Sequence, residues 1–133
     1  MKVFIDSNIP MYVAGAAHAN REPSIHLLNE VRRGMIEGCT STEVLQEILY
    51  RYSALGRLED ARKVYDLFVE ICPAVLDVTP ADTDRACDLL CGTRGISARD
   101  AIHAAVMLNH GISLIATFDA GFDGVPGVRR FVM

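Results

Sequence analysis

Residues 97–117, SARDAIHAAVMLNHGISLIAT, contain the clearest helix and strand signals of the chain. Ser97 is a typical N-cap residue, and Gly111 ends the helix that we predict from Ala98 to about His110. The apolar run over residues 112–117 is predicted to be a buried strand. A helix that leads directly into a buried strand is typical of a parallel sheet covered by helices.

The same alternation extends outward from this stretch. Val3 to Ile5 reads as a short buried strand, and Pro10 suits the first turn of a helix that reaches about Ala17. Weaker strand signals lie at residues 39–42, 74–78 and 128–132, and the helical stripes between them cover residues 24–38, 44–56, 58–71 and 80–91. In the first of these helices, Ser24 is the predicted cap and Gly38 the predicted end.

No β-hairpin turn joins the early strands, and we find no internal repeat or linker. We therefore predict the α/β class: one domain over residues 1–133, with a parallel sheet of four to five strands and helices on both faces.

Composition narrows the possible functions. Half of the 133 residues are hydrophobic, yet every apolar run is too short to cross a bilayer, so we expect no membrane partner. The 13 Lys and Arg residues against 17 Asp and Glu residues give a net charge of −4, which disfavours nucleic-acid binding by bulk electrostatics. Four scattered cysteines without a C-x-x-C pair, and a first strand that begins almost at Met1, favour a cytoplasmic protein without a targeting signal.

Four acidic residues fall where a parallel sheet places its ligands. Asp6 directly follows the first strand, and Asp119 follows the strand at 112–117. Asp100 lies in the first turn of the helix that leads into that strand, and Glu47 lies in the helix after residues 39–42. Because ligands bind beyond the carboxyl ends of parallel strands, we expect these acids to converge. Clustered carboxylates repel one another and raise some of their pKa values, so such a cluster either holds a cation such as Mg²⁺ or is partly protonated.

Each acid also has a structural explanation. Asp100 could complete a capping box with Ser97, and Glu47 could pair with Arg51 one helical turn later. Asp119 could be a turn former. The only structural explanation for Asp6 is a role as the N-cap of the following helix.

Two further residues are assigned to structure. Glu43 competes with Glu47, but it reads as part of a capping box with Thr40. His103 lies three residues after Asp100 on a similar helical face and could approach the acids, but we expect a hydrogen-bonded or packed histidine.

Four motifs in this order and spacing resemble the PIN-domain nucleases, most closely the VapC-type toxins of toxin–antitoxin pairs. They are VFIDSN (residues 3–8), STEVLQEI (41–48), SARDAIHAA (97–105) and ATFDAGFD (116–123). The resemblance implies an endoribonuclease that depends on Mg²⁺ or Mn²⁺, hydrolyses RNA phosphodiester bonds in single-stranded regions, is often a homodimer and is inhibited by a small antitoxin protein.

By this resemblance, the catalytic and metal-binding acids are Asp6, Glu47, Asp100 and Asp119. The predicted supporting residues are Ser7, Asn8, Thr117 and Asp123, and the predicted contacts to RNA phosphates are Arg94 and Arg99.

Two other functions remain open at this point. A strand-end carboxylate such as Asp6 could accept a phosphoryl group in an α/β phosphotransfer protein, although position 8 is Asn and no phosphate-binding glycine motif is present. A catalytically silent PIN-like fold could instead serve as an interaction module. No aromatic platform for stacking bases is predicted from the sequence.

Overall fold

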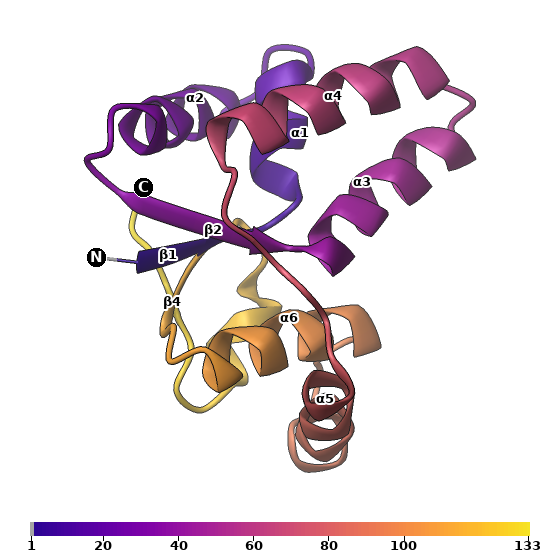
Figure 1. The fold of residues 1–133 in the computed structure, drawn as a ribbon, viewed down its shortest axis with the longest axis vertical. Helices are drawn as coiled ribbons and strands as arrows, with labels where there is room; N and C mark the ends of the chain where they lie inside the picture. The colour runs from indigo at the N-terminus through magenta and orange to yellow at the C-terminus, as the bar shows by residue number, and fades with distance from the viewer. Residues whose placement is uncertain (1) are drawn as a thin grey trace.

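The structure, a computed structural model, describes residues 2–133 and contains a five-stranded parallel sheet (Figure 1). The strands lie in the order β3-β2-β1-β4-β5, and every neighbouring pair is parallel. Their bounds are Lys2–Ile5 for β1, Glu37–Ser41 for β2, Val75–Leu76 for β3, Leu114–Ala116 for β4 and Arg129–Arg130 for β5. The predicted α/β class with a parallel sheet is confirmed.

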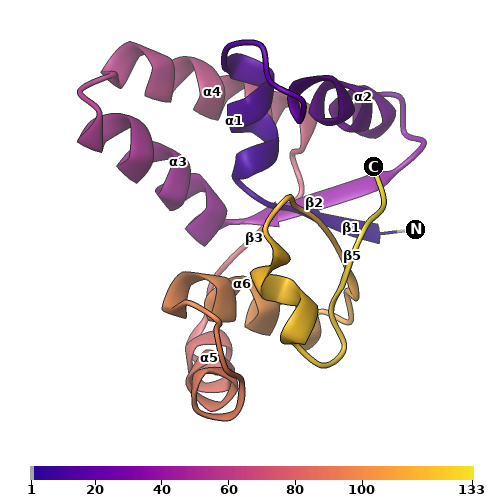
Figure 2. The same ribbon diagram turned by 180° about the vertical axis from the view of Figure 1, so that it is seen from behind.

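Helices cover both faces of this sheet. Figures 1 and 2 show α1 to α4 on one side and α5 and α6 on the other. Their bounds are Asn8–Ala14 for α1, Arg21–Arg32 for α2, Thr42–Ala54 for α3, Leu58–Ile71 for α4, Pro80–Gly92 for α5 and Ala98–Asn109 for α6, with a short 3-10 helix, η1, at Ala120–Gly124. Within residues 2–133, none of the helices has the length and apolar character needed to cross a membrane.

Strand β1 is the centre of the core. Val3, Phe4 and Ile5 are all fully buried, because β2 and β4 flank the strand and helices cover both of its faces. A continuous apolar run of this kind is typical of a strand buried on both faces. Ala101, Ala104 and Ala105 are also fully buried, and their small side chains let α6 lie close to the sheet.

The predicted ends of the second helix are wrong. Helix α2 begins at Arg21, and Ser24 lies inside it with its hydroxyl donating to the carbonyl of Asn20 at 2.7 Å. Pro23 stands in the first turn of this helix, where its missing N–H costs nothing.

Gly38, the predicted helix end, lies in β2 instead. A Cβ atom there would come within 2.8 Å of Val31 and 3.0 Å of Ile5, so the glycine allows α2 to pack against the sheet. The turn after α2 uses Gly34, whose φ of +77° suits glycine.

The direction of the sheet changes at its centre. The chain steps outward from β1 to β2 and β3, and then returns to the opposite side of β1 to form β4 and β5. The switch therefore lies between β1 and β4, and in open parallel sheets this crevice is the usual ligand site. Asp6 and Thr117 are the residues that directly follow these two strands.

Candidate active site

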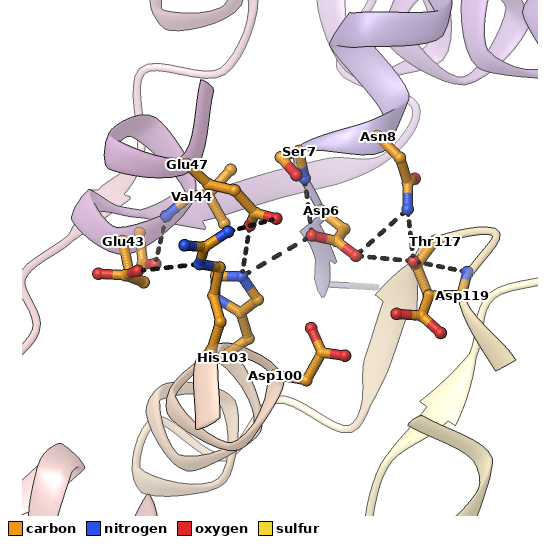
Figure 3. Close-up of polar contacts among 12 residues, drawn as sticks. Asp6, Ser7, Asn8, Glu43, Val44, Glu47, Asp100, His103, Thr117 and Asp119 are labelled. Atoms are coloured by element: carbon orange, nitrogen blue, oxygen red, sulfur yellow. Dashed lines mark hydrogen bonds and ion pairs between the residues drawn. The ribbon is translucent and has the colours of Figure 1, made fainter. Parts of the chain in front are cut away.

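Asp6 lies at the switch point with its carboxylate held from several directions (Figure 3). The backbone N–H of Ser7 donates to Oδ1 at 2.7 Å, and the Thr117 hydroxyl donates to Oδ2 at 2.7 Å. Only 4% of the residue is exposed. Burial raises the pKa of Asp6 above its ordinary value, although His103 and the hydrogen bond from Thr117 act in the opposite direction.

Thr117 connects the ends of β1 and β4. Its hydroxyl accepts hydrogen bonds from the Asn8 side chain and from the backbone N–H of Asp119, each at 3.0 Å, while it donates to Asp6. The Asn8 amide also donates to Asp6 at 3.4 Å. Three of the predicted supporting residues, Ser7, Asn8 and Thr117, therefore contact or orient the first acid.

Glu47 approaches Asp6 from α3 and contacts a buried histidine. The Nε2 atom of His103 lies 3.1 Å from Oε1 of Glu47 and 3.8 Å from Oδ1 of Asp6. Burial opposes ionisation of Glu47, but the hydrogen bond from His103 and the charges of His103 and Arg99 outweigh it and lower the pKa of Glu47. Burial likewise opposes the charged form of His103, yet Glu47 and Asp6 raise its pKa.

His103 is thus buried, as predicted, but it also contacts two of the site acids. Its spacing of three residues from Asp100 on one helix was the available signal, since such residues share a face.

Arg99 and Glu43 form a second layer of charge beside Glu47. The Arg99 guanidinium lies 3.6 Å from a carboxylate oxygen of Glu43 and 3.8 Å from one of Glu47. The predicted capping box of Glu43 with Thr40 is wrong, because Ser41 is the N-cap of α3 and accepts from the backbone N–H of Val44. The Thr40 hydroxyl is buried and donates to the carbonyl of Ile5, so it is not available as a cap.

Asp100 and Asp119 complete the acid cluster from the other half of the chain. The hydroxyl of Ser97 accepts from the backbone N–H of Asp100, so Ser97 caps α6 as predicted. Burial raises the pKa of Asp100, and a hydrogen bond with Asp119 and the charge of Asp119 raise it further. Together they bring the pKa of Asp100 to about 7. The Asp119 carboxylate is exposed and accepts from the backbone N–H of Gly121 at 2.8 Å.

All four predicted acids line a single pocket of about 400 Å³. The rest of its lining consists of Ser7, Asn8, Met11, Tyr12 and Arg51. Ligand atoms of Asp6, Glu47 and His103 lie within 4.8 Å of one another, so the two carboxylates are close enough to share one metal ion. Carboxylate oxygens suit hard divalent cations.

Four predicted residues do not line this pocket: Thr117 and Arg99, which contact its acids Asp6 and Glu47, and Asp123 and Arg94. Asp123 lies on η1, where the Arg130 guanidinium donates to both of its oxygens at 2.8 and 2.9 Å. Arg94 is exposed on the loop between α5 and α6.

Comparison with known proteins places this chain in a family. Residues 3–128 match the PIN domain. The chain is 40% identical both to the VapC ribonuclease Mb1869c of Mycobacterium bovis and to Ribonuclease VapC13 of Mycobacterium tuberculosis, over 96% of this chain and 98% of each relative. The protein belongs to the PIN-domain family and, within it, to the VapC ribonucleases.

Solved structures show the same fold. The crystal structure of Mycobacterium tuberculosis VapC20, described as a Sarcin-Ricin loop cleaving toxin, has a TM-score of 0.77 at 23% identity and covers 96% of this chain and 98% of its own. VapBC2 from Rickettsia felis, bound to a DNA fragment from its promoter, has a TM-score of 0.75 at 18% identity and covers 98% of both chains.

Proposed function

We propose that this protein is a metal-dependent endoribonuclease that hydrolyses RNA phosphodiester bonds and acts as the toxin of a toxin–antitoxin pair. The observation that carries the proposal is the convergence of Asp6, Glu47, Asp100 and Asp119 on one pocket at the switch point of the sheet. Relatives of 40% identity over nearly the whole chain are named ribonucleases, which supports RNA as the substrate.

The acids suit Mg²⁺ or Mn²⁺. The raised pKa values of Asp6 and Asp100 follow from placing carboxylates together in a partly dry pocket, and a cation would remove this conflict. Asp6, Glu47, Asp100 and Asp119 would hold it. When bound, a divalent cation activates a water nucleophile and offsets the charge of the scissile phosphate.

The other residues keep the acids in place. Thr117 and the Ser7 N–H direct the two oxygens of Asp6, and His103 directs Glu47 toward it. Arg99 already faces Glu43 and Glu47, so we assign it to the support of these acids and leave the exposed Arg94 as the candidate contact to RNA phosphates. Asp123, paired with Arg130, has a supporting role only for the loop after β4.

We further propose that the chain is a single PIN domain over residues 1–133 that works in the cytoplasm as a homodimer and is inhibited by a small antitoxin. The structural neighbours include VapBC assemblies from Salmonella typhimurium and nontypeable Haemophilus influenzae, which supports an antitoxin partner.

A cleavage assay on single-stranded RNA tests the proposal. We expect cleavage with Mg²⁺ or Mn²⁺, none with EDTA, and loss of at least a hundredfold in Asp6→Asn, whereas Asp123→Asn, an acid outside the pocket, retains activity. RNA binding without cleavage in the native protein would favour the interaction module. Phosphorylation of Asp6 by a small phosphodonor would favour the phosphotransfer protein.

A further inference from the structure

We infer that Tyr12, His18 and Phe118 form a subsite that stacks against an unpaired nucleobase beside the scissile phosphate. This inference rests on the proposed ribonuclease function and adds to it the part of the substrate that the protein contacts outside the acid pocket.

The three rings come from two distant parts of the chain. Tyr12 lies on α1, His18 on the connection between α1 and α2, and Phe118 on the loop that follows β4. The Tyr12 and His18 ring centroids are 4.8 Å apart at an interplanar angle of 33°, and Phe118 meets Tyr12 edge to face at 5.4 Å. We refer to these three residues as the aromatic group.

The aromatic group is not part of the buried core. Tyr12 and Phe118 are half-buried and His18 is exposed. The orientation of the His18 ring is set by its Nδ1 atom, which accepts a hydrogen bond from the backbone N–H of Asn20 at 3.0 Å. Ring surface held in place at the protein surface is available to a ligand and loses little conformational freedom on binding.

The aromatic group borders the acid pocket. Tyr12 lines this pocket together with Asp6 and Asp119. Phe118 stands between Thr117 and Asp119 in the chain, and with Thr117 it lines a second surface hollow of about 600 Å³. A nucleotide whose phosphate meets the acids therefore has its base within reach of Tyr12, which lines the same pocket, and of Phe118, which packs against Tyr12.

Stacking suits the charge of this protein. The net charge is −4 and four acids surround the reaction site, so general electrostatic attraction does not hold RNA there. Base–aromatic stacking works without net charge and tolerates any base. Bases inside a duplex are already covered on both faces, so the subsite favours unpaired nucleotides.

A fluorescent trinucleotide tests the contact directly. The probe is uridine–2-aminopurine riboside–uridine, whose fluorescence falls when its central base stacks on an aromatic ring, and the background is Asp100→Asn, which slows its cleavage. We expect saturable quenching in this background, loss of most of the quenching with Tyr12→Leu or Phe118→Leu, and retention with Tyr12→Phe, which keeps the ring. Tyr65→Leu, a half-buried tyrosine on α4 away from the acid pocket, is the matched control.

Cleavage kinetics in the otherwise native chain provide a second measurement. We expect Tyr12→Leu to raise KM for single-stranded RNA about tenfold, with kcat changed less than threefold and with the urea midpoint close to that of Tyr65→Leu. We expect Tyr12→Phe to keep the native KM, because this variant retains the ring.

Two results overturn the subsite and leave the ribonuclease intact: native cleavage together with no binding of the trinucleotide, or quenching that is equal in Tyr12→Leu and in the control. Failure of the native protein to cleave RNA with Mg²⁺ and Mn²⁺ is a different outcome, and it removes the proposed function together with the subsite.

Discussion

The Nε2 atom of His103 on α6 lies 3.1 Å from Oε1 of Glu47 on α3, although these two helices cover opposite faces of the sheet (Figure 3). A carboxylate only accepts hydrogen bonds, so Nε2 carries the proton. The other ring nitrogen, Nδ1, is buried and has no hydrogen-bond partner among residues 2–133. The contact thus joins the two helical layers and directs Glu47 toward Asp6.

His103→Leu removes this donor at similar volume, whereas His103→Gln can place an amide donor near the Nε2 position. We expect His103→Leu to weaken Mn²⁺ binding about 10- to 100-fold, the usual cost of removing a group that orients a metal ligand. His103→Gln should recover most of the affinity. Titration calorimetry with Mn²⁺ measures both, and equal losses in the two variants would assign His103 to packing alone.

Thr117 is the second residue whose role can be separated from packing. Thr117→Val keeps the shape but leaves the Asp6 carboxylate and the Asn8 and Asp119 donors without their shared partner. We expect a loss of about 1–3 kcal/mol in the free energy of unfolding and at least a tenfold loss of RNA cleavage. Thr117→Ser keeps the hydroxyl and should stay near native in both. Urea denaturation and the cleavage assay provide the readouts.

The raised pKa of Asp100 predicts how stability depends on pH in the metal-free protein. The folded protein holds the Asp100 proton up to about pH 7, and the unfolded chain releases it near 3.8. Between these values the folded state binds more protons, so the free energy of unfolding falls as pH rises. Because the carboxyl is partly exposed and screened, we expect a fall on the order of 1 kcal/mol from this group.

Asp100→Asn provides the control for this pH effect. With EDTA present, the variant should match the native protein near pH 4 and exceed it in stability at pH 8, where only the native residue ionises. The urea denaturation midpoints of the two proteins at pH 4 and pH 8 measure this difference in stability. A parallel decline in both proteins would mean that another group, such as the buried Asp6, causes the effect.

The contacts around Gly38 predict that a larger residue there lowers the stability of the fold and does not act on the acid site directly. A Cβ atom at this position would lie 2.8 Å from Val31 and 3.0 Å from Ile5, so Gly38→Ala should cost about 1–3 kcal/mol in unfolding free energy. Gly92→Ala, at the end of α5 with nothing within 4 Å of the new methyl group, should be neutral or slightly stabilising. Thermal denaturation compares them, and equal melting temperatures would contradict this account of Gly38.

Local chemistry made much of the fold and the acid cluster predictable. Ser97 caps its helix as its sequence position indicates, and Asp6 and Asp119 follow strands that apolar runs identify. The convergence of the acids then follows from a general property of parallel sheets, since their carboxyl ends meet at one edge.

The features that could not be predicted from the sequence depend on tertiary packing. Gly38 resembles a helix end in the sequence, but it lies in β2, where its lack of a side chain leaves room for Val31 of α2. Whether His103 touches an acid depends on how α3 and α6 lie across the sheet, and no local pattern encodes that distance. The meeting of Tyr12 with Phe118 depends in the same way on the return of the chain at β4.

The switch of direction at β1 also determines when the protein becomes active during its synthesis. Asp6 and Glu47 leave the ribosome early, but Asp100, Asp119 and the strand that completes the central pair belong to the last part to emerge. An unfinished chain that stops before α6 lacks half of its acids and one neighbour of its central strand. A cell that makes this protein is therefore not exposed to its proposed RNA-cleaving activity by prematurely terminated products.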